Sequence, residues 1–373
     1  MGYWLRDKVK SWSSQALDDI QRWDLPASGV VSAIQIQAQA QRNATARDAN
    51  TKAALLEDGL DAIEIIEGGS KVIKSLDGAL LSAHNLFDFR QIPEYHQAGM
   101  ADDWNRHNLF INFGRFPMDP VYGLNLANHE ECQLVIDHNF ADTTKVGFKA
   151  ASVAFDLWIW RYIGAEITPL GFFKTSEKEA YTQGSTSGAE HRLELPKKNP
   201  IRRILVRSYI TTKTPGECIT SIEVECNDGE FKPVFASPMA TNAAYYALKQ
   251  IRAIARGSDG VPGSATDVHV ETNMPYSNDM SALYRNVGAA KTADLYVKTD
   301  GANLQFYSQA ANFEFYWRNA GTGYQHVTPI CFDVPDEPES YFSTAELSKI
   351  ELIITEAGQQ SANKIVLDEL VMY

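Results

Sequence analysis

Two stretches of this chain resemble each other over 24 residues without a gap. They read FGRFPMDPVYGLNLANHEECQLVI at 113–136 and CFDVPDEPESYFSTAELSKIELII at 331–354. The constant offset of 218 matches three pairs in particular: Pro117 with Pro335, Pro120 with Pro338, and Leu134 with Leu352. Two prolines three residues apart fix similar bends before an extended apolar run, so the match has meaning for the backbone. We therefore predict an internal structural repeat defined by these six residues.

Three weaker matches follow the same chain order. They pair 31–36 with 201–206, 60–65 with 219–224, and 155–157 with 367–370. A short helix is predicted after each member of the second pair, near 78–87 and 242–255. Four matches in one order predict two domains of one ancestral type, joined across a Ser/Gly-rich stretch from about Thr175 to Pro200. The offset grows from about 160–170 to 218 along the chain, which predicts a loop insertion in the second domain at about 256–310.

Most of the chain has a β pattern. Short runs such as Ile34–Gln37, Ala62–Ile65 and Phe155–Trp160 alternate apolar with polar residues between turn residues. Many short strands with few helices favour sandwiches or barrels over a parallel α/β sheet. The fold class is therefore predicted to be all-β.

The first residues are predicted to form an amphipathic helix over 3–23, ended by Pro26 and Gly29. Apolar residues recur at steps of three to five, and cations lie near its start. One interpretation is a helix docked on the body of the protein. The other is a helix that faces a membrane or a neighbouring subunit, because tryptophan and lysine suit an interface. The residues proposed for that face are Trp4, Arg6, Lys8, Lys10, Trp12 and Trp23.

Charge and motifs exclude several classes of function. The 373 residues carry a net charge of -13, which argues against a surface that grips nucleic acid. No apolar run is long enough for a membrane-spanning helix, and the four cysteines are predicted to be free thiols in a reducing cytoplasm. The sequence lacks a nucleophile elbow, a phosphate-binding loop and a zinc-protease motif. We predict no catalytic residue, no metal site and no cofactor. Arg202, Arg203 and Arg207 are predicted not to form one patch, because alternation on a strand puts Arg202 opposite the other two.

The pattern from Asn108 to Phe116 and Asp119 to Leu124, followed by Leu134–Ile136, resembles the first barrel of double-jelly-roll major capsid proteins. Residues Leu193–Pro196, Ile201–Val206 and Ile222–Val224 resemble the entry to the second barrel. These proteins build tailless icosahedral double-stranded DNA viruses of the adenovirus and tectivirus lineage, bacteriophages among them. The resemblance implies two tandem eight-stranded jelly rolls over 26–190 and 191–373, after the helix at 1–25.

The resemblance also implies what the protein does. It implies a homotrimer with a pseudo-hexameric outline that tiles a virion shell after folding and assembling in the host cytoplasm. The implied partners are further capsomers, penton and minor capsid proteins, and an internal lipid membrane. Sequence-specific binding to nucleic acid is not implied.

Two alternatives stay open. One is a tandem carbohydrate-binding or carbohydrate-active β-sandwich protein, with Trp104, Trp317 and Tyr324 as stacking platforms. The other is a minor virion or spike protein of the same lineage. Glycan binding without self-assembly would favour the first alternative, and copy number in purified particles would separate the second from a major shell protein.

Overall fold

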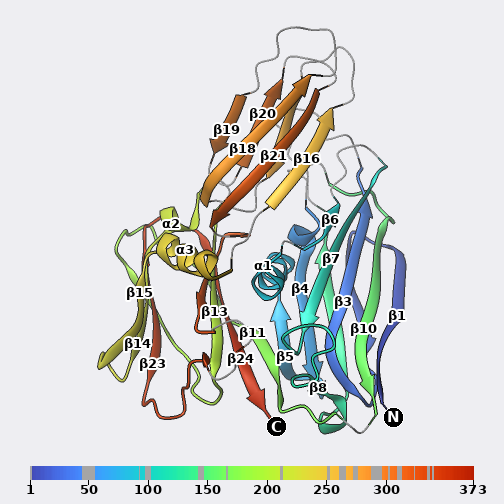
Figure 1. Ribbon diagram of the computed structural model, residues 1–373, viewed down its shortest axis with the longest axis vertical. Helices are drawn as coiled ribbons and strands as arrows, with labels where there is room; N and C mark the ends of the chain where they lie inside the picture. The colour runs from blue at the N-terminus through green and yellow to red at the C-terminus, as the bar shows by residue number, and fades with distance from the viewer. Residues whose placement is uncertain are drawn as a thin grey trace.

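The computed structural model describes residues 2–43, 55–91, 93–96, 102–141, 147–164, 167–210, 213–249, 253–259, 266–271, 276–286, 296–300, 303–308, 313–322, 324–333, 337 and 340–373. From 246 to 322 it describes the backbone alone. Most of the described residues are in strands, with two longer helices (Figure 1).

Residues up to 163 form ten strands. These are β1 (Tyr3–Gln15), β2 (Asp18–Asp24), β3 (Val30–Gln41), β4 (Leu60–Glu67), β5 (Lys71–Leu76), β6 (Tyr95–His96), β7 (Trp104–Asn112), β8 (Leu124–Asn125), β9 (Cys132–Asn139) and β10 (Val153–Ile163). The helix α1 (Gly78–Phe89) follows β5, and two 3-10 turns are η1 (Glu57–Gly59) and η2 (Leu126–Asn128). We call this part unit 1.

Unit 2 begins with β11 (Gly171–Thr182). Its other strands are β12 (Glu190–Glu194), β13 (Ile201–Tyr209), β14 (Ile219–Cys226), β15 (Phe231–Ala236), β22 (Val327–Cys331), β23 (Ile350–Glu356) and β24 (Ala362–Met372). Its helices are α2 (Pro215–Cys218) and α3 (Pro238–Lys249). Strand pairing places β11 beside β24, so the described sheets of unit 2 start near residue 171 rather than at 191.

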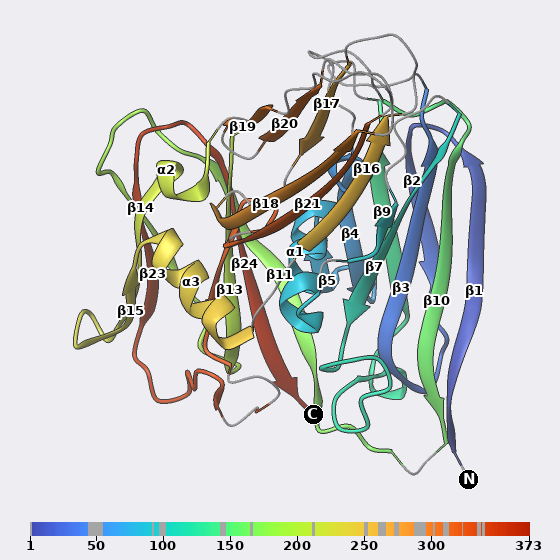
Figure 2. The same ribbon diagram turned by 45° about the horizontal axis from the view of Figure 1, so that its top comes forward.

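The same strand order occurs in both units. In unit 1 the orders are β1-β10-β3-β7 and β2-β9-β4-β5, and in unit 2 they are β11-β24-β13-β22 and β12-β23-β14-β15. The second sheet of unit 1 joins the first sheet of unit 2 through β5 and β11, which makes one sheet of eight strands. Figures 1 and 2 show the other two sheets at opposite sides of the molecule.

Matching irregularities confirm the repeat. A β-bulge requires one extra residue at a defined place in a strand. In the β3–β10 pair the register skips Ser32, and in the β13–β24 pair it skips Arg202, 170 residues later. The β1–β10 pair skips Val9, and the β11–β24 pair skips Lys178, 169 residues later. Units 1 and 2 therefore correspond residue by residue along their strands, from the first strand onward.

The register confirms three of the four sequence matches and corrects the fourth. Leu134 lies opposite Ile65 and Leu352 lies opposite Val224, both fully buried, so the offset of 218 holds for β9 and β23. The offset between β10 and β24 is 208, because Gln35 pairs with Trp158 as Leu205 pairs with Val366. The match of 155–157 with 367–370 chose the right strands with a register error of four residues.

The predicted N-terminal helix is wrong, because β1 and β2 occupy residues 3–24. Exposed and half-buried residues alternate from Arg6 to Lys10, as they do on a strand at a sheet edge. Register shifts at Val9 and after Trp12 change the phase of this alternation. They spread the apolar residues to steps of three to five, which imitates a helical period.

The predicted loop insertion consists largely of strands. Between α3 and β22 the chain forms β16 (Ala253–Asp259), β17 (Thr266–Glu271), β18 (Tyr276–Asn286), β19 (Tyr296–Asp300), β20 (Asn303–Ser308) and β21 (Phe313–Thr322). They pair as two three-stranded sheets, β16-β21-β18 and β17-β20-β19, at the end of the molecule opposite both termini (Figure 1). The helix predicted at 242–255 is α3 at 238–249, and its last predicted residues start β16 instead.

Each unit has its own apolar core, but the two cores differ in extent. Ile204, Val206, Ile365 and Leu367 line the core of unit 2 from one face of β13 and β24. Leu205 and Val366, on the other face of the same strands, belong to the core cluster of unit 1. Alternate residues of a strand point to opposite faces, so these two strands serve both cores.

Candidate functional site

The junction between the units is the candidate functional site, because it fixes how the two units are oriented. Its backbone element is a short parallel pairing of β5 with β11, in which Lys74 lies opposite Thr175 and Ser75 opposite Ser176. Unit 2 also covers α1, whose residues from Gly78 to Phe87 are all buried. The N-cap of that helix is Asp77, whose side chain accepts a hydrogen bond from the Leu80 amide at 2.7 Å.

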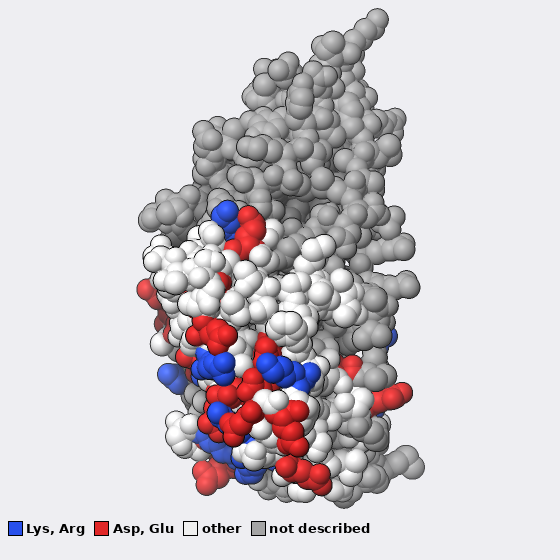
Figure 3. Space-filling view, turned by 90° about the vertical axis from the view of Figure 1, so that its left-hand side faces the viewer, with Lys and Arg blue, Asp and Glu red and all other residues white. Residues whose placement is uncertain are grey.

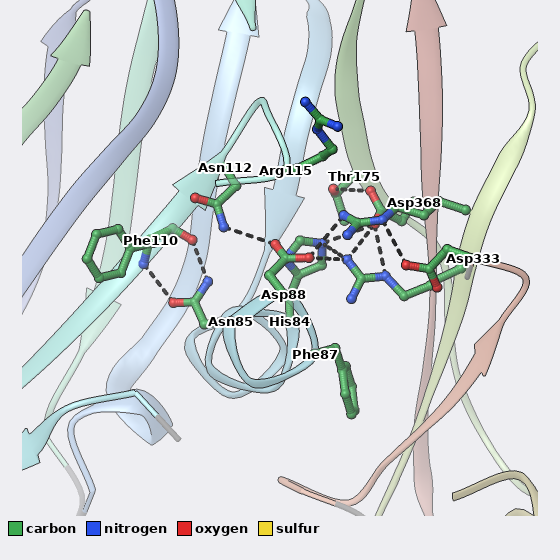
Figure 4. Close-up of polar contacts among 12 residues, drawn as sticks. His84, Asn85, Phe87, Asp88, Phe110, Asn112, Arg115, Thr175, Asp333 and Asp368 are labelled. Carbon is green, nitrogen blue, oxygen red and sulfur yellow. Dashed lines mark hydrogen bonds and ion pairs between the residues drawn. The ribbon is translucent and has the colours of Figure 1, made fainter. Parts of the chain in front are cut away.

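A buried network of charges spans this junction (Figure 4). From unit 1, His84 and Asp88 project from α1; from unit 2, Arg203 and Asp368 project from β13 and β24. The Arg203 guanidinium donates to Asp368 at 2.8 Å and to Asp88. His84 bridges the two carboxylates, with Nδ1 at 3.2 Å from Asp88 and Nε2 at 3.3 Å from Asp368.

Three further groups extend the network. Arg202 lies 3.0 Å from Asp88 and 3.3 Å from Asp333. The Lys74 ammonium donates to the Thr175 hydroxyl at 2.7 Å, and that hydroxyl donates to Asp368 at 2.9 Å. Three cations, Lys74, Arg202 and Arg203, thus accompany three carboxylates, Asp88, Asp333 and Asp368. This balance compensates for the cost of burying charge.

The proton equilibria follow from burial and pairing. Burial opposes the charged forms of Asp88 and Asp368, but His84 and the two arginines outweigh it and hold both carboxyl pKa values well below their usual range. Burial lowers the pKa of Lys74 to about 8. The groups form a rigid set of ion pairs, and their arrangement serves to lock one unit against the other.

A bulge explains why sequence reasoning missed this network. Strict alternation would place Arg202 and Arg203 on opposite faces. Because the register skips Arg202, both guanidiniums reach Asp88. Arg207 also points to this side and lies 3.3 Å from Asp77. The prediction that the three arginines form no common patch is therefore wrong, because strict alternation does not hold across a bulge.

The residues predicted on the N-terminal face lie on β1 and β2. Arg6 stacks over Trp158 and Trp160, with 5.5 and 5.0 Å from its Cζ to the ring centroids. Lys8 lies 2.8 Å from Asp156, and Lys10 lies 5.6 Å from the ring of Trp12. These contacts order the outer face of β1 and β10. The tryptophans pack on the protein itself: Trp4 against Tyr162, and Trp12 and Trp23 against the core of unit 1.

The other predicted residues fall into two groups. Pro117 and Pro120 lie in the turn region after β7, and Leu134 and Leu352 are core residues of β9 and β23. Pro335 and Pro338 lie outside the described residues, as does the side chain of Trp317. Tyr324 is 3% exposed, so it offers no stacking platform for a sugar, whereas Trp104 is exposed.

Two further features of the described residues concern metal binding and membrane insertion. The described residues contain no group of three or more histidine, cysteine, aspartate or glutamate side chains placed to hold a metal ion. No described helix has both the length and the apolar character needed to span a bilayer. The four cysteines all lie in the described part of the chain and form no disulfide, and three of them are buried.

Comparison with solved structures identifies the fold. The STIV MCP, from Sulfolobus turreted icosahedral virus, matches with a TM-score of 0.61 and 13% identity over 99% of this chain and 96% of its own. The major capsid protein P2 from bacteriophage PM2 matches with 0.55 and 8% identity over 100% and 98%. Vp54 of PBCV-1 matches with 0.58 and 9% identity over 99% and 94%.

Sequence comparison adds no assignment, since no family model and no curated protein matches this chain. The likeness to these viral proteins nevertheless covers nearly the whole of each chain, and two units with the same strand order account for it. The chain has the double-jelly-roll fold that these major capsid proteins share.

Proposed function

We propose that this chain is the structural major capsid protein of an icosahedral virus, with no enzymatic activity. The observation that carries the proposal is the match to three major capsid proteins over 98–100% of this chain, both units included. The buried charge network supports it, because a shell subunit needs its two units held in one orientation.

The proposed assembly is a homotrimer. One chain with two similar units offers two similar sides, so threefold symmetry gives six, which is the outline that tiles a shell. Light scattering after size exclusion tests this directly. A species of three 41.5 kDa chains, about 124 kDa, is expected. A monomer at every concentration would contradict the proposal, and a trimer present in only a few copies per purified particle would instead indicate a minor or spike protein.

Further partners follow from the same proposal: neighbouring capsomers, penton and minor capsid proteins, and an internal membrane. The predicted N-terminal helix gives no support for membrane contact, because residues 3–24 form strands. Support comes instead from the end of the molecule where both termini lie (Figure 1). This end exposes two pairs of apolar residues: Tyr3 and Ile163, which pair at the end of β1 and β10, and Leu170 and Met372, at the paired ends of β11 and β24. We place this end toward the virion interior, with assembly in the host cytoplasm. Flotation of the trimer with liposomes tests membrane contact, and a quadruple serine variant of these residues is expected to lose it.

A further inference from the structure

Unit 2 covers one side of unit 1, which carries β5 and α1. The corresponding side of unit 2 carries β15 and α3 and is exposed. The offset of 160 that relates β5 to β15 also relates α1 to α3. Ala79, Leu80, Ala83 and His84 of α1 are buried, and His84 contacts Asp368 and Arg203 of unit 2. Their counterparts on α3 are Met239, Ala240, Ala243 and Ala244, and all four are exposed.

The neighbouring strand edge is open in the same way. Among the described strands, β15 pairs only with β14, whereas its counterpart β5 pairs with both β4 and β11. Phe235, the counterpart of Ser75, is 71% exposed. Figure 3 shows an uncharged zone on this side of the molecule, above the charged residues of β14, β15 and β23. An open strand edge beside exposed apolar residues is a surface that another strand can extend.

The complementary surface is on unit 1. Within the chain, β11 fills the edge of β5, and the counterpart of β11 is β1. In the described sheets β1 pairs only with β10, so its outer edge is open as well. The offset of 169 makes Arg6 the counterpart of Thr175 and Asp7 the counterpart of Ser176.

The buried charges at the centre of the junction have uncharged counterparts on both open surfaces, and the charges that remain there include Arg6 and Lys8 of the edge strand β1. On α3, Ala244 and Leu248 stand where α1 has His84 and Asp88. On β3 and β10, Ala33 and Trp160 stand where unit 2 has the paired Arg203 and Asp368. A charge left on one surface alone would be buried without a partner if the two surfaces met. Their joint replacement by uncharged residues is what contact between the surfaces requires.

We propose that β15 and α3 of one copy dock on β1 and β10 of the next copy, in parallel register, with Val234 opposite Arg6 and Phe235 opposite Asp7. The occupant is a second copy of this chain, so the inference rests on the proposed trimer and specifies its interface. The contact is heterologous, because each copy offers β15 and accepts at β1. Such contacts close into a ring when the rotation allows it.

A matched pair of substitutions tests the interface. Phe235→Asp places a carboxylate opposite Asp7 in the proposed contact and is expected to convert the trimer to a folded monomer in light scattering. Phe231→Asp is the control: Phe231 is also exposed and lies on the same strand, but its counterpart Lys71 stays exposed beside the junction inside the chain. The control is expected to remain trimeric. Equal trimer content in both variants would overturn the proposal.

Cross-linking tests the register itself. Asp7→Cys combined with Phe235→Cys is expected to give a ladder of covalent dimers and trimers with a short bismaleimide, since the counterparts Ser176 and Ser75 pair within the chain. Asp7→Cys combined with Phe231→Cys is expected to give little product. A wild-type monomer would contradict the proposed function itself. A wild-type trimer that neither cross-links through position 235 nor dissociates with Phe235→Asp would overturn this interface alone.

Discussion

The strand pair β13–β24 and its counterpart β3–β10 share one register and one bulge, yet their outer faces have different chemistry. In β13–β24 that face carries Leu205, Val366 and the Arg203–Asp368 pair, all buried against unit 1. In β3–β10 it carries Trp158 and Trp160, which lie beneath Arg6, and Gln35, which accepts a hydrogen bond from Arg6 and donates one to Asn108.

The difference shows that the neighbour, rather than the backbone, sets the chemistry of a sheet face. A cross-strand ion pair illustrates this at one position. Lys8 and Asp156 lie 2.8 Å apart in unit 1, and their counterparts Glu177 and Lys364 lie 3.2 Å apart with the charges reversed. Either order of charges suits the corresponding strand pairs β1–β10 and β11–β24. The fold therefore requires opposite charges at these two positions but does not determine which strand carries the cation.

The largest expected loss of stability follows from removing a cation from the buried network between the two units. Arg203→Met leaves Asp88 and Asp368 buried with less compensation, and we expect a loss of about 3–5 kcal/mol in the free energy of unfolding. Urea denaturation of the variant measures it. Arg192→Ala, which removes an exposed cation of β12, is the control and is expected to leave the transition midpoint unchanged. Similar midpoints for the two variants would show that the network does not hold the units together.

A second comparison uses one helix position in two settings. Ala83 of α1 is fully buried at the junction, and its counterpart Ala243 of α3 is exposed. Ala83→Asp buries a new carboxyl group, and the expected cost is about 3 kcal/mol of unfolding free energy. Ala243→Asp makes the same chemical change on the open side, where only the lower helix propensity of aspartate applies, and should cost the isolated chain about 0.7 kcal/mol or less. Thermal unfolding of both substitutions in the monomeric Phe235→Asp background decides the point, and equal losses there would contradict the assignment of covered and open sides.

Two corresponding histidines differ in what faces them. His107 of β7 lies 3.1 Å from Glu57, whereas its counterpart His326, in the turn before β22, is buried near Arg207. Burial, with a smaller contribution from Arg207, lowers the pKa of His326 to about 4. The unfolded chain then binds more protons, so stability is full above about pH 6.5 and falls by about 2–3 kcal/mol as the pH decreases to 4.

The variant His326→Asn isolates this effect. Asparagine tolerates the left-handed conformation of residue 326 and does not titrate in this range. Denaturant titrations between pH 7 and pH 4 should give a shallower loss of stability than in the wild type. An identical slope would assign the acid sensitivity to other groups.

The smallest expected effect is at the exposed member of the reversed ion pairs. Lys8→Ala removes a half-exposed cation from Asp156 and should cost about 0.5 kcal/mol or less. Lys364→Ala should cost about 1 kcal/mol, because Lys364 also lies 3.0 Å from Asp77. Denaturation at low and high salt measures both. A larger loss of unfolding free energy for Lys8→Ala than for Lys364→Ala would contradict the expected order of the two ion pairs.

The sequence predicted the duplicated β fold because the two units share the proline spacing that precedes β9 and β23 and the apolar runs within these strands. It did not predict the start of the repeat, because β-bulges in β1 give apolar residues a helical spacing. The junction network escaped prediction for a related reason: it joins residues up to 284 positions apart, and one of its arginines lies at a bulge. Local pattern predicts which strands form, whereas bulges and distant partners decide which side chains meet.

We infer that the junction inside one chain recurs between chains, with uncharged residues in place of its buried charges. A cryo-electron microscopy map of the purified trimer is the most direct test. We expect six similar units in a ring, with β15 and α3 of each chain against β1 and β10 of the next. A ring in which β15 and α3 face solvent would contradict this inference.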